Sequence, residues 1–166
     1  MNFKDTGCIY QGAWVKGKRE GQGSMLYHGP GGGCYEGCFV NNSITGGGTF
    51  AFKNGDRYEG AFERGQMSGA GTYTFSNGDV FKGRFEDNLK EGEGVLSYAC
   101  GDEYRGRFLH DLKHGPGHFT YADNRSYRGI WEEGKFKAYN QGKGAAAPAA
   151  IEAAVVQGPG MASDQS

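Results

Sequence analysis

Residues 58–75 read YEGAFERGQMSGAGTYTF, and this stretch contains the two short patterns that decide the fold. The first pattern is aromatic-x-Gly-x-aromatic, formed here by Tyr58, Gly60 and Phe62. The second is Gly-x-Gly-x-apolar-x-aromatic, formed here by Gly69, Gly71, Tyr73 and Phe75. In both patterns the special residues recur at every second position, which is the spacing of side chains on one face of a β-strand. The stretch therefore predicts two strands joined by a turn.

The first pattern occurs six times along the chain at a nearly constant interval. It lies at Tyr10-Gly12-Trp14, Tyr35-Gly37-Phe39, Tyr58-Gly60-Phe62, Phe81-Gly83-Phe85, Tyr104-Gly106-Phe108 and Tyr127-Gly129-Trp131. Successive occurrences are 25 residues apart once and then 23 residues apart four times. The second pattern follows each of the first five occurrences but not the sixth. The chain is thus predicted to be a tandem array of hairpin repeats that ends in half a repeat.

The connections between the strands indicate how the hairpins are joined. Asn54-Gly55 and Asn77-Gly78 lie between repeats and predict tight two-residue hairpin turns. The turn inside each repeat, for example from Glu86 to Glu91, is expected to be longer. Short connections make neighbouring strands antiparallel, so the predicted fold class is all-β. It is an elongated, twisted, single-layer antiparallel β-meander of tandem 23-residue hairpin repeats, with about eleven strands and no closure.

Two local features refine this prediction. A glycine between two aromatic residues leaves a gap in which a ring from the neighbouring strand can lie over bare backbone. The additional residues in His28-Gly29-Pro30-Gly31-Gly32-Gly33 are expected to form a local bulge or a floppy turn.

Composition excludes several classes of protein. Glycine accounts for 32 of the 166 residues and aromatic residues for 14% of the chain, without the Gly-X-Y period of collagen. The aromatic content argues against glycine-rich disorder. The formal net charge of -1 gives no overall field that would favour nucleic acid or a membrane. No apolar run approaches the length of a membrane span, and the first residues lack a signal region, so we expect a cytoplasmic protein.

The chain divides into three parts. Residues 1–9 are expected to be a lead-in strand, and residues 10–139 form the repeat array. Units of the array start at residues 10, 35, 58, 81 and 104, and a partial unit starts at 127. Residues 140–166 are rich in Ala and Gly and are expected to be a flexible tail. Within the tail, Ile151 to Gln157 could form a transient helix that acts as a docking peptide or a simple linker.

Two units carry a resemblance to a known family. The segment from Tyr10 to Gly23 and the segment from Tyr104 to Gly117 resemble MORN (membrane occupation and recognition nexus) repeats, whose pattern is roughly Y-x-G-x-W-x-x-G-K-x-H-G-x-G. The mid-repeat Gly-Lys is clear at Gly17-Lys18 and Gly134-Lys135, and the histidine survives as His114. The resemblance implies a scaffold or adaptor that links partner proteins to membrane or cytoskeleton, often in cilia, flagella or the cell cortex. It also implies a groove that can grip a partner helix.

Neither a catalytic site nor a cofactor site is predicted. Phosphate-binding loops and nucleophile elbows are missing from the sequence, and only about 30 residues lie outside the array, so we expect no enzyme. A zinc site could involve Cys34 and Cys38, or the set His110, His114 and His118. The simpler interpretation is that these cysteines replace ordinary outward residues and are free thiols. We therefore expect no metal.

The residues that alternate with the aromatic positions suggest a second surface. In the later repeats they are basic, and a meander places them side by side as a stripe formed by Lys82, Arg84, Arg105, Arg107 and Arg128. This basic stripe could bind acidic phospholipid headgroups or an acidic partner, or it could be a solvated face that Glu86, Glu103 and Glu132 partly neutralise.

The leading function is a non-enzymatic scaffold, and the alternatives are direct binding of anionic phospholipid and a targeting subunit for a separate enzyme. The partner is expected to be a cytoskeletal protein, a motor or an enzyme, and not nucleic acid. Exposed end strands make self-association as a homodimer plausible. The residues predicted for the repeat core and groove are Tyr10, Trp14, Tyr35, Phe39, Tyr58, Phe62, Phe81, Phe85, Tyr104, Phe108, Tyr127 and Trp131.

Overall fold

The structure is a computed structural model that describes residues 9–139. In this range the chain forms twelve β-strands and no helix. The strands are β1 (Ile9–Val15), β2 (Lys18–Tyr27), β3 (Gly33–Val40), β4 (Ser43–Phe52), β5 (Arg57–Glu63), β6 (Gln66–Thr74), β7 (Val80–Glu86), β8 (Leu89–Ser97), β9 (Glu103–Leu109), β10 (Leu112–Thr120), β11 (Ser126–Glu132) and β12 (Lys135–Tyr139). The tail at 140–166, and the lead-in segment apart from Ile9, lie outside the described residues.

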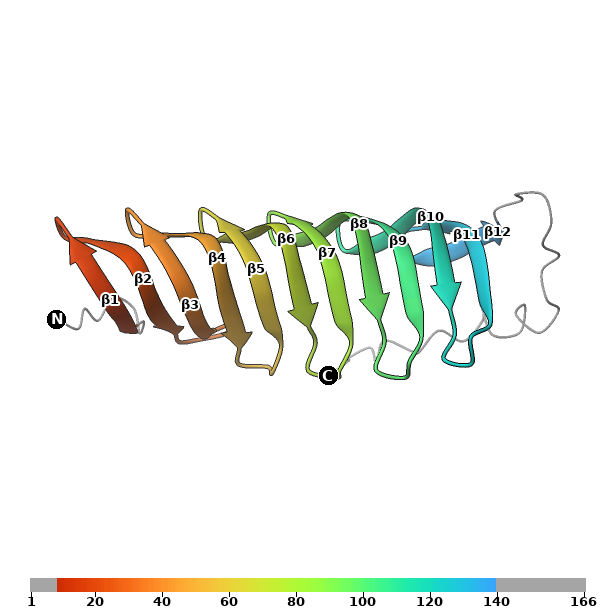
Figure 1. The fold of residues 1–166 in the computed structure, drawn as a ribbon, viewed down its shortest axis with the longest axis horizontal. Helices are drawn as coiled ribbons and strands as arrows, with labels where there is room; N and C mark the ends of the chain where they lie inside the picture. The colour runs from red at the N-terminus through yellow and green to blue at the C-terminus, as the bar shows by residue number, and fades with distance from the viewer. Residues whose placement is uncertain (1–8, 140–166) are drawn as a thin grey trace.

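All twelve strands belong to one sheet, in which their order in space is their order in the sequence. Every neighbouring pair is antiparallel. Figure 1 shows the resulting elongated sheet, which runs from β1 at one end to β12 at the other without closing. The predicted all-β single-layer meander is confirmed, although it has one strand more than the eleven expected. The additional strand is β12, in which Phe136 pairs with Trp131.

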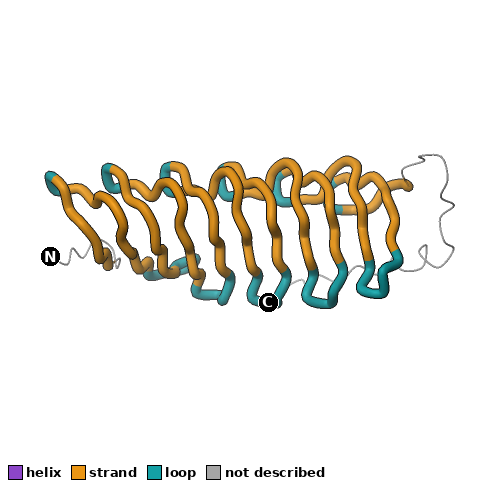
Figure 2. The backbone as a smooth tube through the Cα atoms, in the orientation of Figure 1, coloured by secondary structure: helices purple, strands orange, loops and turns teal. Residues whose placement is uncertain are grey.

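The two kinds of turn are the reverse of what the sequence suggested. Inside each repeat the strands are joined by two residues, both with positive φ, which is the type I′ geometry that matches the twist of a hairpin. These turns are Lys16-Gly17, Asn41-Asn42, Arg64-Gly65, Asp87-Asn88, His110-Asp111 and Glu133-Gly134. Between repeats the connections are longer. Figure 2 shows the short turns along one edge of the sheet and the longer ones along the other.

The Asn-Gly pairs lie inside these longer connections. In the turn between β4 and β5, the side-chain oxygen of Asn54 accepts a hydrogen bond from the amide of Asp56 at 3.0 Å, and Gly55 has φ +92°. The turn between β2 and β3 spans residues 28–32, because Tyr27 pairs with Gly33. In the two following connections the amide of Phe52 bonds to Asp56 across residues 53–55, and the amide of Phe75 bonds to Asp79 across residues 76–78, so the two additional residues of the first repeat lie in the turn, where the sequence placed them.

The first glycine of the Gly-x-Gly pattern lies at a break in the ladder. In each of the five full repeats the pairing within the hairpin shifts register at a bulge in the second strand. The first glycine lies in this bulge with φ between 71° and 78°, a left-handed conformation that favours glycine. These residues are Gly21, Gly46, Gly69, Gly92 and Gly115.

The second glycine of the pattern makes room for a ring. Gly48 pairs with Gly37 of the neighbouring strand, and the ring of Tyr35 lies over both residues. A Cβ atom on Gly48 would lie 2.5 Å from the Tyr35 hydroxyl oxygen and 2.6 Å from the ring. A ring does lie over bare backbone, as expected. For Gly37, the glycine between the two aromatic residues, this ring comes from its own strand and not from the neighbouring strand.

The core is a ladder of aromatic rings along one face of the sheet. Within a repeat, Tyr58 packs edge-on against Phe62 with ring centroids 5.1 Å apart, and across to the next repeat it packs against Phe85 at 4.9 Å. The same zigzag of T-shaped contacts runs from Trp14 through Tyr10 and Phe39 to Trp131. Each such pair contributes about 0.5–1.5 kcal/mol beyond the area it buries, so every repeat stabilises its neighbours.

Candidate functional site

The predicted core and groove residues all lie on this face, which we call the aromatic face. Most of them are buried, among them Phe39, Phe62, Phe85 and Phe108, each at most 6% exposed. Trp14 at the end of the sheet is 38% exposed, and Tyr127 is half-buried. The buried rings hold the repeats together and leave little of their own surface for a partner.

A second row of aromatic residues on the same face is half-buried, and it offers the surface that the first row lacks. Its rings contact one another in places, with Phe50 4.5 Å from Phe52 and Tyr73 4.7 Å from Phe75 between centroids. The second aromatic row consists of Tyr27, Phe50, Phe52, Tyr73, Phe75, Tyr98, Phe119, Tyr121 and Tyr127. The sequence reveals these positions through the Gly-x-Gly pattern, but the predicted site included only Tyr127 of this row.

Three cations also lie on the aromatic face, at equivalent positions of different repeats. They stand opposite the second aromatic residue of the hairpin, where Arg19 pairs with Trp14, Lys90 with Phe85 and Lys113 with Phe108. The guanidinium of Arg19 lies 5.7 Å from the centroid of Phe39. In the second and third repeats the position is apolar, with Ile44 and Met67. The two glycine patterns do not reveal these cations, because their positions lie beside the turn and outside both patterns.

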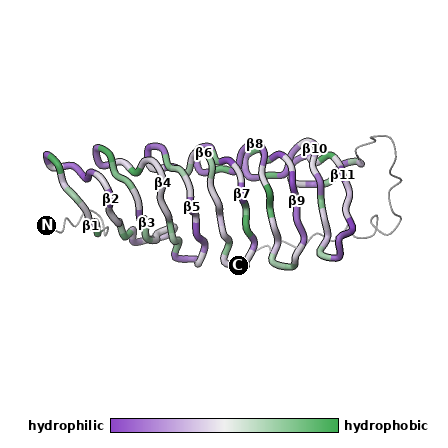
Figure 3. Tube along the Cα trace, in the orientation of Figure 1, coloured by the Kyte–Doolittle hydropathy of each residue, from purple (hydrophilic) through white to green (hydrophobic). Residues whose placement is uncertain are grey.

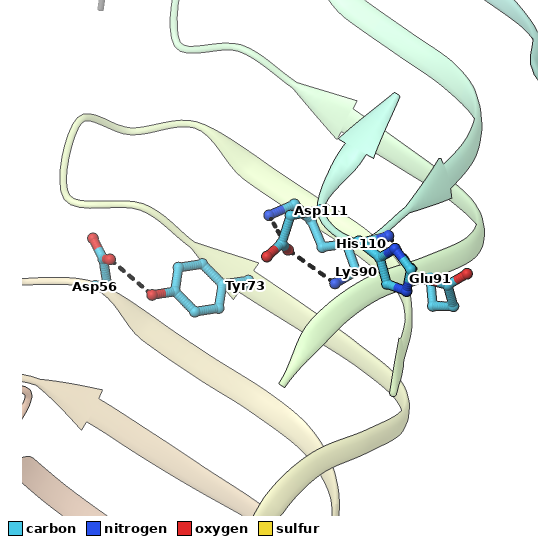
Figure 4. A network of polar contacts seen from close by, with 6 residues as sticks. All are labelled: Asp56, Tyr73, Lys90, Glu91, His110 and Asp111. Carbon is cyan, nitrogen blue, oxygen red and sulfur yellow. Dashed lines mark hydrogen bonds and ion pairs between the residues drawn. The ribbon is translucent and has the colours of Figure 1, made fainter. Parts of the chain in front are cut away.

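The two lysines have different surroundings. The ammonium of Lys90 lies 2.8 Å from a carboxylate oxygen of Asp111, the second turn residue of the next repeat (Figure 4). The ammonium of Lys113 lies 5.1, 5.0 and 5.6 Å from the ring centroids of Tyr98, Tyr104 and Phe119. Burial among these rings lowers the pKa of Lys113 from its usual 10.5 to about 8.

Side chains along both edges of the sheet link consecutive repeats. In the longer connections, an aspartate carboxylate accepts a hydrogen bond from a backbone amide about twenty residues further along the chain. Asp56 accepts from Ser76, Asp79 from Ala99 and Asp102 from Ala122. In the short turns, Asn42, Asn88 and Asp111 accept the amides of Arg19, Met67 and Lys90 in the preceding repeat. These bonds fix the spacing between hairpins.

The buried tyrosines Tyr35, Tyr58 and Tyr104 remain neutral near neutral pH. Desolvation by burial raises the pKa of Tyr35, Tyr58 and Tyr104 to about 12. The hydroxyl of Tyr73 donates to Asp56 at 2.8 Å (Figure 4). Burial opposes the ionisation of Asp56, but hydrogen bonds from Tyr73, Ser76 and Asn54 still hold the pKa of this carboxyl below its usual value. These groups therefore serve as structural hydrogen-bonding groups in this setting.

The basic stripe lies on the opposite, outer face, and all five of its side chains are exposed. Across the sheet, Val95 separates Lys82 from Arg105, and His118 separates Arg105 from Arg128. Arg105 pairs with Glu103 at 3.2 Å, and Arg107 lies 3.9 Å from Glu93. Within residues 9–139, Lys82, Arg84 and Arg128 make no ion pair. Within the described residues, none of these three side chains is therefore neutralised by a neighbouring carboxylate.

The outer face of the first repeats has a different character. Glu36 and Glu59 are exposed in the row that continues to Lys82, so the charge in this row changes from acidic to basic along the sheet. A wide, shallow hollow of about 570 Å³ lies on the acidic part. It is lined by backbone glycines and by the polar side chains of Gln11, Gln22, Ser24, Glu36 and Thr49.

The residues considered for zinc do not assemble into a metal site. Cys34 and Cys38 are half-buried and unbonded to one another, and Cys38 accepts a long contact from Gln22 at 3.8 Å. In the part of the chain that the structure describes, no group of three His, Cys, Asp or Glu side chains could hold a metal ion.

Residues 9–139 form no helix long and apolar enough to cross a membrane. Figure 3 shows polar and apolar segments alternating along the sheet.

Comparison with known families agrees with this geometry. The MORN repeat family model matches residues 10–31, 35–57, 58–80, 81–103 and 104–124, which together make up more than half of the chain. The protein belongs to the MORN repeat family. MORN repeats form a non-enzymatic family generally associated with scaffolds that bind proteins or membranes. A search among curated proteins found no match to the chain.

The structure explains the MORN pattern of this chain residue by residue. The tyrosine and the glycine that follows it form a ring-over-backbone contact, and the first glycine of Gly-x-Gly forms the bulge. The mid-repeat Gly-Lys at Gly17-Lys18 and Gly134-Lys135 provides the second residue of the type I′ turn. Where this glycine is missing, Asn42, Asn88 and Asp111 take its positive φ. The sixth unit, which starts at Tyr127, lies outside the matched residues; it forms an antiparallel hairpin with the same kind of turn, but Gly129 pairs with Tyr139 where the full repeats pair two glycines.

Proposed function

We propose that this MORN repeat protein is a non-enzymatic scaffold that binds a partner protein on its aromatic face and holds it at a membrane or at the cytoskeleton. The proposal rests on one observation, the half-buried second aromatic row, which continues along the sheet beside a fully packed core. The partner is a cytoskeletal protein, a motor or an enzyme. The setting is a cilium, a flagellum or the cell cortex, as the family resemblance implies.

The physical argument for binding on this face is the difference in exposure between the two aromatic rows. Tyr35, Tyr58 and Tyr104 are completely buried and hold the sheet together. The rings of the second row are partly open to solvent and add apolar surface to one face. Large rings that remain accessible on a rigid surface are typical of the centres of protein interfaces, where aromatic residues supply much of the binding energy.

Affinity capture from native cells tests the scaffold proposal. Tagged wild type is compared with Phe52→Thr/Phe75→Thr, which removes two rings of the second aromatic row and leaves the buried first row unchanged. We expect a defined partner to be recovered with wild type and at least tenfold less of it with the variant. Circular dichroism and thermal unfolding verify that the variant is folded. Equal recovery by a folded variant would exclude the aromatic face as the binding site.

A second candidate function, binding of anionic phospholipid, is favoured by the basic stripe. Lys82 and Arg128 are exposed and lack an ion pair within the described residues, and Arg84 shares these properties. Exposed cations attract a negatively charged membrane surface by about 1 kcal/mol each.

Flotation with vesicles of phosphatidylcholine, with and without a phosphoinositide, tests lipid binding. Lys82→Glu/Arg105→Glu should abolish binding to the acidic vesicles. The control Lys53→Glu/Arg64→Glu makes the same change in net charge at exposed positions outside the stripe and should retain most of the binding. If both variants lose binding equally, the effect comes from net charge and the stripe is not a site.

A further inference from the structure

Lys113 occupies an unusual position when its repeat is compared with the one before it. Lys90 and Lys113 stand at equivalent sites, opposite Phe85 and Phe108. In both repeats the backbone carbonyl of the lysine accepts a hydrogen bond from the second turn residue of the next hairpin, at 3.1 and 3.0 Å. For Lys90 that turn residue is Asp111, whose carboxylate pairs with the ammonium. For Lys113 it is Gly134, which has no side chain.

Because Gly134 stands where the preceding repeat has Asp111, the ammonium of Lys113 has no carboxylate acceptor within the described residues. Among residues 9–139, Lys113 makes no ion pair and its ammonium donates no hydrogen bond. Three rings surround it at about 5 Å from centroid to nitrogen. Rings attract a cation by roughly 0.5–2 kcal/mol, but they do not accept its three hydrogen bonds as a carboxylate does.

The ammonium of Lys113 lies beside the second aromatic row, the proposed binding surface. Two of the surrounding rings, Tyr98 and Phe119, belong to the second aromatic row. A partner lying on that row would displace water from the ammonium and make an uncompensated charge more costly. At the equivalent positions of the second and third repeats, Ile44 and Met67 present apolar groups instead.

We infer that the partner segment bound on the aromatic face carries an acidic side chain that pairs with Lys113 and takes the place that Asp111 has beside Lys90. This inference rests on the proposed scaffold function and specifies the chemistry of the partner. The segment is apolar where it crosses Ile44 and Met67 and has a carboxylate where it crosses β10. Because a single buried ion pair strongly disfavours other alignments, Lys113 sets the direction and register of the bound segment.

The chain itself provides the variants for a test. Gly134→Asp recreates the turn of the preceding repeat, because Gly134 has φ +77° and Asp111 adopts φ +70° in the same place. Its carboxylate would neutralise Lys113 from within. Gly134→Asn is the matched control, since Asn42 and Asn88 occupy equivalent turn positions with φ +73° and +72° and bring no charge.

The probe is a displayed library of amphipathic 24-residue helical peptides in which each position of the apolar face is apolar, Glu, Gln or Lys. Selection on wild type should enrich peptides with Glu at one position of that face. Replacing this Glu by Gln should weaken binding about tenfold, as expected for a charged hydrogen bond. Gly134→Asp should cause a similar loss and Gly134→Asn less than a twofold one. On Lys113→Met, which copies Met67, the Glu and Gln peptides should bind equally.

The alternative outcomes separate this inference from the scaffold proposal. If the selected peptides show no preference for Glu, or bind Gly134→Asp as tightly as Gly134→Asn, the inference is overturned. The scaffold proposal survives that result if the same peptides fail to bind Phe52→Thr/Phe75→Thr. If the peptides also bind this variant unchanged, and native capture is unaffected by it, both proposals fall.

Discussion

The two faces of this sheet are made from adjacent residues of the same strands, yet they obey different constraints. Gly48 faces the ring of Tyr35, and a methyl group there would overlap the ring. Gly47, the next residue along the chain, has no atom within 4 Å of the place where its Cβ would lie. The aromatic face therefore encodes the fold position by position. The outer face is free to vary, and in this chain it carries charge.

The largest effect on the free energy of unfolding is expected from alanine substitutions at these two adjacent glycines. Gly48→Ala should lower the free energy of unfolding by about 2–3 kcal/mol, because the added methyl group forces the buried Tyr35 ring away from the backbone. Gly47→Ala should change it by less than about 0.5 kcal/mol, since the equivalent position in the third repeat is already Ala70. Urea denaturation of both variants measures the difference.

Similar stabilities for the two alanine variants would contradict the ring-over-glycine packing. A large loss in both would instead indicate that flexibility of the Gly46-Gly47-Gly48 segment matters more than contact with Tyr35. Neither result is compatible with a fold specified from the aromatic face alone.

The next largest effect concerns Lys113, a cation of the aromatic face that makes no ion pair within the described residues. Its pKa is about 8 in the folded state and 10.5 ordinarily, so between these values the unfolded chain binds more protons than the folded chain. The contribution of Lys113 to the free energy of unfolding should therefore rise with pH through this window, with a slope of at most about 1.4 kcal/mol per pH unit. Lys113→Met should remove this contribution. Urea denaturation of both proteins from pH 7.5 to 8.5, where tyrosines of the unfolded chain with their ordinary pKa of about 10 are still protonated, measures it.

Gly134→Asp sharpens the same comparison. A carboxylate beside the ammonium favours the charged form, so this variant should also flatten the rise in stability with pH. Gly134→Asn should keep it. If the free energy of unfolding had the same slope against pH in wild type and Lys113→Met, the ammonium of Lys113 would be solvated. Its lack of an ion pair would then have no effect on stability.

Most of the fold could be predicted from spacing alone, because each repeated aromatic and glycine has one geometric task. The turns could not. Asn54-Gly55 resembles a two-residue hairpin turn, yet Asp56 has to reach the Ser76 amide of the next repeat, and this requires a longer connection. Asp87-Asn88 contains no glycine but still forms the tight turn, since Asn88 tolerates positive φ and bonds to Met67.

The candidate site was less predictable than the fold. Both the buried and the half-buried aromatic rows have the same residue types and the same period, and their different exposure arises from packing between repeats. The cations were hidden for a related reason. Lys90 and Lys113 look alike in the sequence, and their difference depends on Asp111 and Gly134, which are separated from them by 21 residues in each case. Binding roles for these residues stay predictions.

The smallest effect is expected at the edge of the sheet, where side chains link consecutive repeats. Asp102 accepts the amide of Ala122 at 2.9 Å, and Asp102→Ala should lower the free energy of unfolding by about 1 kcal/mol through loss of this bond. Asp102→Asn keeps an oxygen in the same place and should be close to wild type. If Asn were as destabilising as Ala, the charge of Asp102 would be the stabilising factor and the bond would not. A loss confined to the bond would show that the array is coupled through its turns as well as through its rings, so that a partner bound on one repeat is held in a fixed geometry relative to the next.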